Sequence, residues 1–115
     1  ANILLDFSLN RLSGLVNNLV VYPENMRANL NKLCGLVNSQ RVLLALIQEG
    51  KSREKAYEIV QRCAMIVWDT KEEFFEILAN DKEVSQLLSR KQLESCFDEN
   101  FHLKNVDIIF DRVFE

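Results

Sequence analysis

The stretch ILLDFSLNRLSGLVNNL, residues 3–19, decides how the chain can fold. Its apolar side chains recur every three or four residues, which is the spacing of one face of an α-helix. Further apolar residues widen this face beyond a single stripe, so the stretch predicts a helix that is apolar on several sides. A helix of that kind is buried by more than one neighbour. The stripe consists of Leu5, Leu9, Leu12, Val16 and Leu19, and it is widened by Ile3, Leu4, Phe7 and Leu15.

Charged residues are distributed unevenly along the chain. Residues 1–49 hold seven of them, whereas residues 50–115 hold 24. The first part is too poorly charged for two helices with one face in water, and the rest of a 115-residue chain offers little material to cover it. We therefore expect the cover to come from other parts of a longer chain or from other subunits. The sequence also opens on the helical pattern without a Met, so we interpret its start as a cut through a longer protein.

Helical patterns continue through almost the whole sequence, and no stretch shows the alternation of a strand. Pro23 breaks the first pattern and suits the first turn of a second helix, which is predicted over residues 24–49 and ended by Gly50. Ser52 can cap a third helix over residues 53–69. The second helix is expected to turn inward Met26, Leu30, Leu33, Val37, Leu44 and Ile47, and the third Ala56, Ile59, Val60, Cys63, Ile66 and Val67.

Three capping-box signals predict three shorter helices. In each, a Ser, Thr or Asn is followed three residues later by Glu or Gln. The pairs are Thr70 with Glu73, Asn80 with Glu83, and Ser89 with Gln92. The first of these helices is predicted over residues 71–79. Residues 96–102 are interpreted as a loop, and a last helix begins near residue 103 or 104. With only three Gly and one Pro, the sequence predicts an all-α fold. The last helix is expected to turn inward Val106, Ile109, Phe110 and Val113.

Composition excludes several classes of protein. The net charge of -3 is not the basic excess of a nucleic-acid binder. No apolar run approaches the roughly 20 residues of a membrane span. The first ten residues lack the basic region of a secretory signal peptide. The chain has three cysteines, Cys34, Cys63 and Cys96. Because their number is odd and their spacing matches no metal site, they form neither a disulfide framework nor a zinc site. We expect them to be reduced core thiols of a cytoplasmic protein. We expect no nucleic acid, no membrane and no cofactor as partners.

Side chains that could carry chemistry are few, and none forms a known constellation. His102 is the only histidine, and its distance from nearby acidic residues matches no metal-ligand pattern, so it is interpreted as a loop or helix-start residue. Arg41 lies in an apolar stretch, where a contact between helices or subunits is favoured over a ligand contact. We therefore predict no catalytic, no cofactor-binding and no metal-binding residue in this sequence. Glu72, Glu73 and Glu76 are interpreted as a solvated face, and Tyr57 and Trp68 as aromatic residues of the core or its rim.

Several short motifs occur in the order and at the spacing of one known family. They are VVYPENM at residues 20–26, Asn29-Leu30, Gly35-Leu36, SQRVLLAL at 39–46, SREKAY at 52–57, Val60-Gln61, Ala64, CFD at 96–98 and HLKNVDIIF at 102–110. Together they resemble the C-terminal part of bacterial adenylosuccinate lyases, members of the fumarase/aspartase superfamily. The matches cover essentially all 115 residues, and their specificity lies in the combination.

The resemblance implies an all-helical, three-domain homotetramer with a central bundle of long helices. It places residues 1–20 on the last long helix of the central domain and residues 21–115 in the C-terminal helical domain. The family eliminates fumarate from adenylosuccinate and from the succinyl-carboxamide intermediate of purine synthesis. In that reaction a serine removes the proton and a histidine acts as the acid, without a cofactor.

The family's catalytic groups have no counterpart in this sequence. Its signature loop, Gly-Ser-Ser-x-Met-Pro with a following Asn-Pro, needs two prolines, whereas the chain has only Pro23. His102 matches none of the family's catalytic histidines. The resemblance thus implies a structural C-terminal fragment, inactive by itself, whose partners are the rest of the parent chain and sister subunits. The alternative is an independent helical protein-interaction module. We also expect the isolated chain to self-associate.

Overall fold

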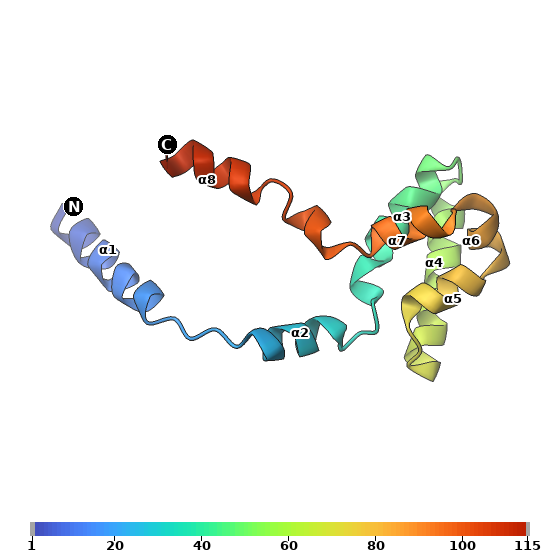
Figure 1. Cartoon of the computed structure of the whole chain (residues 1–115), viewed down its shortest axis with the longest axis horizontal. Coiled ribbons are helices and arrows are strands. Elements are labelled where there is room, and N and C mark those ends of the chain that lie inside the picture. Colours follow the sequence, from blue (N-terminus) through green and yellow to red (C-terminus); the bar gives the residue numbers. More distant parts are fainter. Residues whose placement is uncertain (1, 115) are drawn as a thin grey trace.

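A computed structural model describes residues 2–114 of the chain. Over that range the backbone forms eight α-helices and two short 3₁₀ helices and contains no strand, which confirms the predicted all-α fold. Helices α3 to α7 pack into a hub, whereas α1 and α2 form an N-terminal arm and α8 a C-terminal arm (Figure 1). The helices are α1 (Asn2–Asn17), α2 (Pro23–Asn31), η1 (Leu36–Asn38), α3 (Ser39–Gln48), α4 (Arg53–Thr70), α5 (Phe74–Asn80), α6 (Lys82–Leu87), α7 (Arg90–Cys96), η2 (Glu99–His102) and α8 (Val106–Phe114).

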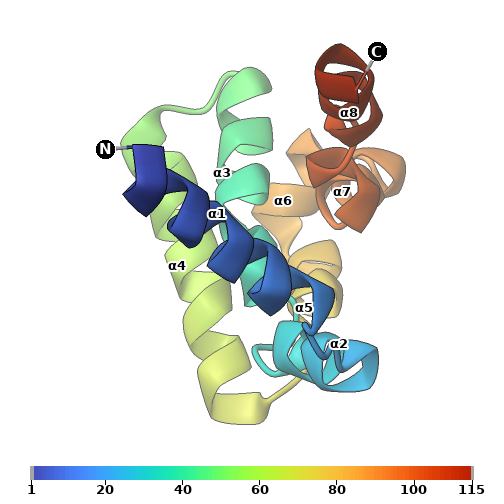
Figure 2. The same cartoon turned by 90° about the vertical axis from the view of Figure 1, so that its left-hand side faces the viewer.

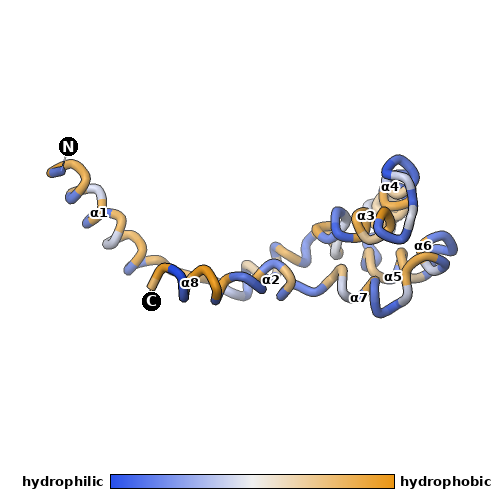
Figure 3. Tube along the Cα trace, turned by 90° about the horizontal axis from the view of Figure 1, so that it is seen from above, coloured by the Kyte–Doolittle hydropathy of each residue, from blue (hydrophilic) through white to orange (hydrophobic). Residues whose placement is uncertain are grey.

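The two arms give the molecule an elongated shape. Its radius of gyration is 20.2 Å, whereas a compact chain of this length has roughly 13 Å. Both arms extend from the same side of the hub and remain apart from each other (Figures 1 and 2). None of the residues of α1, α2 or α8 is buried, although apolar residues continue along both arms (Figure 3).

The core lies entirely within the hub. Helix α4 contributes most to it, because its buried residues recur at helical spacing and face α3 and α5. The inward face predicted for this helix is confirmed except at Ile66, which is exposed. The core consists of Val42 and Leu46 from α3, Ala56, Ile59, Val60, Cys63 and Val67 from α4, Phe74 and Leu78 from α5, and Val84, Leu88, Leu93 and Cys96 from α6 and α7 with the residue between them.

The single helix predicted over residues 24–49 is wrong, because the chain turns between α2 and α3. Cys34 and Gly35 have φ angles of 48° and 83°, both in the left-handed region. A Cβ atom at residue 35 would lie 3.2 Å from the Phe97 ring, so glycine suits this position on two grounds. The Cys34 carbonyl accepts a hydrogen bond of 2.9 Å from the Phe74 amide, and this bond connects the turn to the first residue of α5.

This turn changes which residues of α3 face the core. Val42 and Leu46 are fully buried there, although neither belongs to the predicted stripe. Ile47 is partly buried against the core. The other residues of the predicted stripe are exposed, namely Met26, Leu30, Leu33, Val37 and Leu44.

The helix caps confirm part of the sequence prediction. Ser52 caps α4 by accepting a hydrogen bond from the Lys55 amide, and Ser89 with Gln92 forms the predicted capping box of α7. Gly50 has a φ of 93° directly after α3, as expected of a residue that ends a helix. In the turn that follows, the Lys51 amide donates to the Leu46 carbonyl and the Gly50 amide to the Ile47 carbonyl.

The other two predicted capping boxes are wrong. Thr70 stays inside α4, where its hydroxyl donates to the Ile66 carbonyl, and α5 begins only at Phe74. Asn80 is the last residue of α5. Its neighbour Asp81 caps α6 instead, because the carboxylate accepts hydrogen bonds from the Glu83 and Val84 amides.

The C-terminal region also differs from the predicted loop and helix. Cys96 is the last residue of α7, and the following turn contains the 3₁₀ helix η2 (Glu99–His102). The last helix begins at Val106, two or three residues later than predicted. Its expected inward residues are all exposed in the described part of the chain.

Candidate functional site

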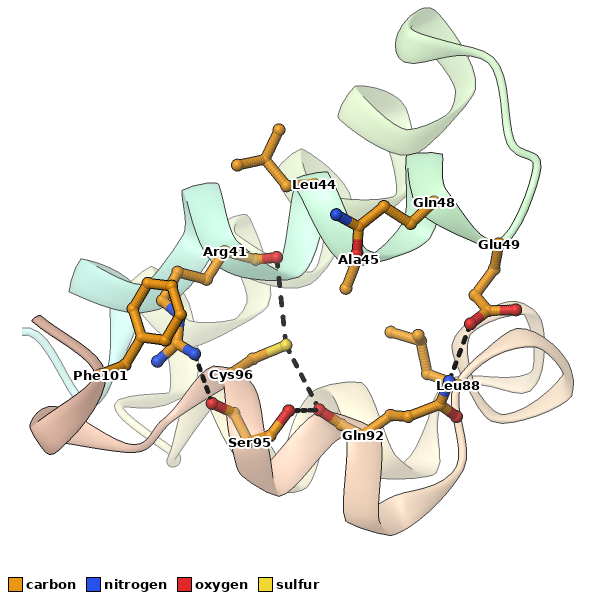
Figure 4. Close-up of a pocket in the computed structure, with 10 residues that line it drawn as sticks. All are labelled: Arg41, Leu44, Ala45, Gln48, Glu49, Leu88, Gln92, Ser95, Cys96 and Phe101. Carbon is orange, nitrogen blue, oxygen red and sulfur yellow. Dashed lines mark hydrogen bonds between the residues drawn. The ribbon is translucent and has the colours of Figure 1, made fainter. Parts of the chain in front are cut away.

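A groove of about 330 Å³ lies between α3 and α7 in the hub (Figure 4). Five of the ten residues that line it are apolar and five are polar, a composition that fits a ligand pocket as well as a packing contact. The apolar residues are Leu44, Ala45, Leu88, Cys96 and Phe101, and the polar residues are Arg41, Gln48, Glu49, Gln92 and Ser95.

Most polar groups of the groove are already engaged with one another. The Gln92 Nε2 donates to Glu49 Oε1 at 2.7 Å, which ties the start of α7 to the end of α3. The Gln92 Oε1 accepts from the amide and the hydroxyl of Ser89 as part of the capping box. The Ser95 hydroxyl donates to the Gln92 carbonyl at 2.7 Å. The Gln92–Glu49 bond links α7 to α3, whereas the other bonds lie within α7 and its cap, and together they leave few polar groups for a ligand.

Arg41 makes the interhelix contact that the sequence predicted. Its Nη2 donates to the Ser95 carbonyl at 2.6 Å and its Nη1 to the Asp98 carbonyl at 2.9 Å. The guanidinium also lies 4.0 Å from the centroid of the Phe101 ring. A helix leaves its last carbonyls without partners and carries partial negative charge there, so a guanidinium at the end of α7 is favourable.

A second groove, of about 480 Å³, lies where α2 approaches η2. Its polar lining includes Glu73, Glu99 and His102, and Arg27 of α2 pairs with Glu99 at 3.3 Å. His102 is the last residue of η2 and lies edge-on to Phe101, with ring centroids 5.5 Å apart. The interpretation of His102 as a loop or helix-start residue is therefore wrong in detail, since it is the last residue of a short 3₁₀ helix.

The cysteines are free, as predicted, and two of them lie in the core. Burial raises the pKa of the Cys63 thiol to about 11 and also raises the pKa of Cys96. Such thiols stay protonated at neutral pH and are poor nucleophiles and poor metal ligands. Cys34 is only half-buried. Within residues 2–114, no group of three His, Cys, Asp or Glu side chains is placed to hold a metal ion.

An ion-pair cluster joins α4 to the start of α6. Arg62 contacts Asp81 at 2.8 Å and Glu83 at 3.0 Å. Partial burial opposes ionisation of Asp81, but the Arg62 hydrogen bond and the Val84 amide outweigh it and lower the pKa of this carboxyl. The cluster therefore contributes to stability, and its groups do not converge on a cavity.

The arms present the most extensive uncovered apolar surface. In α1 five polar residues share one side, and apolar residues occupy most of the remaining circumference, together with Ser8 and Arg11. In α8 apolar residues recur at three- and four-residue spacing. None of the helices described between residues 2 and 114 is long and apolar enough to cross a membrane. The polar side of α1 consists of Asn2, Asp6, Asn10, Ser13 and Asn17.

The hub also carries exposed aromatic residues that were expected in the core or at its rim. Tyr57 and Trp68 lie on α4 and are both about half exposed. The Lys71 ammonium approaches the Trp68 ring at 4.9 Å from the centroid. These residues add a smaller apolar patch to the uncovered surface.

Fold and surface together define an all-α segment with a small closed core and two uncovered apolar arms. The family described as "Adenylosuccinate lyase C-terminus" matches residues 35–113. The chain is also 48% identical, over 113 residues, to adenylosuccinate lyase of Bacillus subtilis (strain 168). This chain therefore belongs to the adenylosuccinate lyase family, as the sequence motifs indicated. The match covers 98% of the chain but 26% of that relative, so the chain spans about a quarter of the relative's length.

Sequence reasoning missed the contacts that connect the arms to the hub. The Arg27–Glu99 pair joins residues 72 positions apart, and Phe101 was not singled out at all. The only available signal was the presence of charged residues in a charge-poor region, which identified Arg41. Nothing in the local sequence reveals that Phe101 lies beside it.

Proposed function

We propose that the chain is the C-terminal part of an adenylosuccinate lyase and serves that enzyme as a structural segment. The observation that carries the proposal is the family match over residues 35–113, together with 48% identity to the Bacillus subtilis enzyme. In this proposal residues 1–20 are the end of a long helix of the central bundle, and residues 21–115 form the C-terminal helical domain of a cytoplasmic enzyme.

The arms supply the structural role. A helix with apolar residues around most of its circumference, such as α1, is suited to contact two or more neighbouring helices at once. The proposed partners are the rest of the subunit and the sister subunits of a homotetramer. The absence of buried residues in α1, α2 and α8 supports this assignment, because these helices have no cover within the described chain.

The proposed reaction is elimination of fumarate from adenylosuccinate and from the succinyl-carboxamide intermediate of purine synthesis. We propose that the groups transferring the proton come from outside this chain. Two features of the hub support this part of the proposal. Arg41, Glu49 and Gln92 are engaged in packing contacts, and the buried thiols are protonated at neutral pH.

The test is fumarate release from adenylosuccinate by the 115-residue chain and by the longer protein that contains it. We expect turnover by the longer protein only. Turnover by the isolated chain that survives repurification would contradict the structural role. A longer protein without turnover would contradict the lyase assignment and favour an independent helical protein-interaction module.

A further inference from the structure

Within the described residues, the joint between the hub and the C-terminal arm packs on the core at its first residue, Phe97, whose ring contacts Phe74 and Phe75. Residues 97–105 connect α7 to α8, and η2, the helix within them, contains no buried residue. The direction of α8 therefore depends on a few side-chain contacts between η2 and the body of the molecule. Those contacts come from two arginines on different helices.

Arg41 of α3 makes three contacts at the joint. Its guanidinium donates to the Ser95 carbonyl at the end of α7 and to the Asp98 carbonyl directly before η2. Its third contact is the Phe101 ring inside η2, 4.0 Å from the guanidinium to the centroid. Lys104 approaches the same ring at 4.3 Å. A planar guanidinium can make two hydrogen bonds and stack at the same time, which a lysine cannot.

Arg27 of α2 reaches the same joint from the N-terminal arm. Its Nη1 lies 3.3 Å from the Glu99 Oε1 on the first turn of η2. The N-terminal arm is thereby linked to the joint, although the two residues are 72 positions apart in the sequence. In Figure 1, α2 and the chain leading to α8 leave the hub on the same side.

We propose that Arg41 forms a clasp that fixes the direction in which the C-terminal arm leaves the hub, and that the solvent-exposed Arg27–Glu99 pair adds little to it. Arg41 is then a positioning residue for the apolar stripe of α8. An arm held in one direction loses less conformational entropy when it docks, so the clasp favours docking. The inference rests on the proposed function in one respect, namely that α8 docks on another part of the enzyme.

Hydrogen exchange of the 115-residue chain tests the clasp without any measurement of activity. In Arg41→Gln we expect amides of residues 99–106 to exchange at least tenfold faster, with no comparable change in α4, which reports on folding. Arg41→Lys should be intermediate, because lysine keeps the charge but loses the fork and the stacking. Arg53→Gln is the matched control, since Arg53 is exposed and makes no hydrogen bond or ion pair in the described part of the chain.

Two outcomes for the 115-residue chain would overturn the clasp. One is unchanged exchange of residues 99–106 in Arg41→Gln, and the other is an equal increase throughout the hub, which would make Arg41 an ordinary stabilising residue. In the longer protein we expect docking to protect the amides of α8 from hydrogen exchange. In Arg41→Gln these amides should exchange at least tenfold faster than in the wild type. Protection of α8 equal to the wild type would also overturn the proposal. A longer protein that shows these changes but has no lyase activity would contradict the proposed function alone.

Discussion

Gly35 is the residue at which the path of the chain depends most on the absence of a side chain. Its φ of 83° is left-handed, and a Cβ would lie 3.2 Å from the Phe97 ring. We expect Gly35→Ala to lower the free energy of unfolding by about 1–2 kcal/mol or more, measured by urea denaturation. Gly14→Ala is the control, because Gly14 lies in a helix with open space around it. An alanine at 35 that leaves stability unchanged would show that the turn tolerates a side chain.

Asp81 connects stability to pH through its lowered pKa. Because the pKa of the folded state lies below the unfolded value of roughly 3.9, Asp81 stabilises the fold above that value, and the contribution is lost as the pH falls below it. Asp81→Asn should cost about 1 kcal/mol at pH 7, since half-exposed Arg62 is screened by solvent. The difference from wild type should shrink as the pH falls through the lowered pKa of the folded-state carboxyl.

The control for Asp81 is Glu58→Gln. Glu58 pairs with Lys55 on the open surface of α4, so we expect no measurable change in stability at any pH. A stability difference between Asp81→Asn and wild type that persists unchanged as the pH falls through the lowered pKa of Asp81 would show that ionisation of Asp81 is not the cause.

At the scale of the element, α3 offers a matched pair of leucines that tests which of its faces is buried. Leu46 is fully buried, whereas Leu44 is about half exposed at the edge of the groove. We expect Leu46→Ala to cost about 2–5 kcal/mol in the free energy of unfolding, because it leaves a cavity. Leu44→Ala should cost less than about 1 kcal/mol. A larger loss for Leu44→Ala than for Leu46→Ala in urea denaturation would show that the face predicted from the unbroken helix is the buried one.

The elements that sequence alone predicted are those whose signals are local. Helix α4 follows from its own apolar spacing and from the Ser52 cap, and the capping box of α7 lies within four residues. The turn between α2 and α3 depends instead on Phe74 and Phe97, which lie far along the chain. The isolated Gly35 was the only local sign of it.

The same limit applies to the candidate site. A need for a partner at Arg41 was predictable from the cost of burying a lone charge. Its acceptors lie 54 and 57 residues away, however, so their identity required the packing of α7 on α3. The exposure of α8 was not predicted either, because an apolar stripe indicates that a helix is covered but does not reveal which molecule covers it.

At the scale of the whole molecule, the uncovered arms have a consequence for the isolated chain. Burying about five of their Leu or Ile side chains would contribute roughly 1.5–3 kcal/mol each, or on the order of 10 kcal/mol. This is comparable to the net stability of a whole domain. Pairing of arms between copies provides such burial, most simply as an antiparallel two-fold pair or a helical bundle. Fraying of α1 is the alternative, because an isolated helix of that length is marginal in water.

We therefore expect the isolated chain to form dimers or tetramers, with α1 in the contact. Leu12→Glu places a charge on the apolar surface of α1, and sedimentation over a range of concentrations should show a shift toward monomer. Asn10→Glu is the matched control, because it adds the same charge to the polar side of the same helix and should leave association unchanged. An equal response to both substitutions would place the contact elsewhere. A wild-type chain that stays monomeric at every concentration, with α1 ordered by NMR, would contradict both association and fraying.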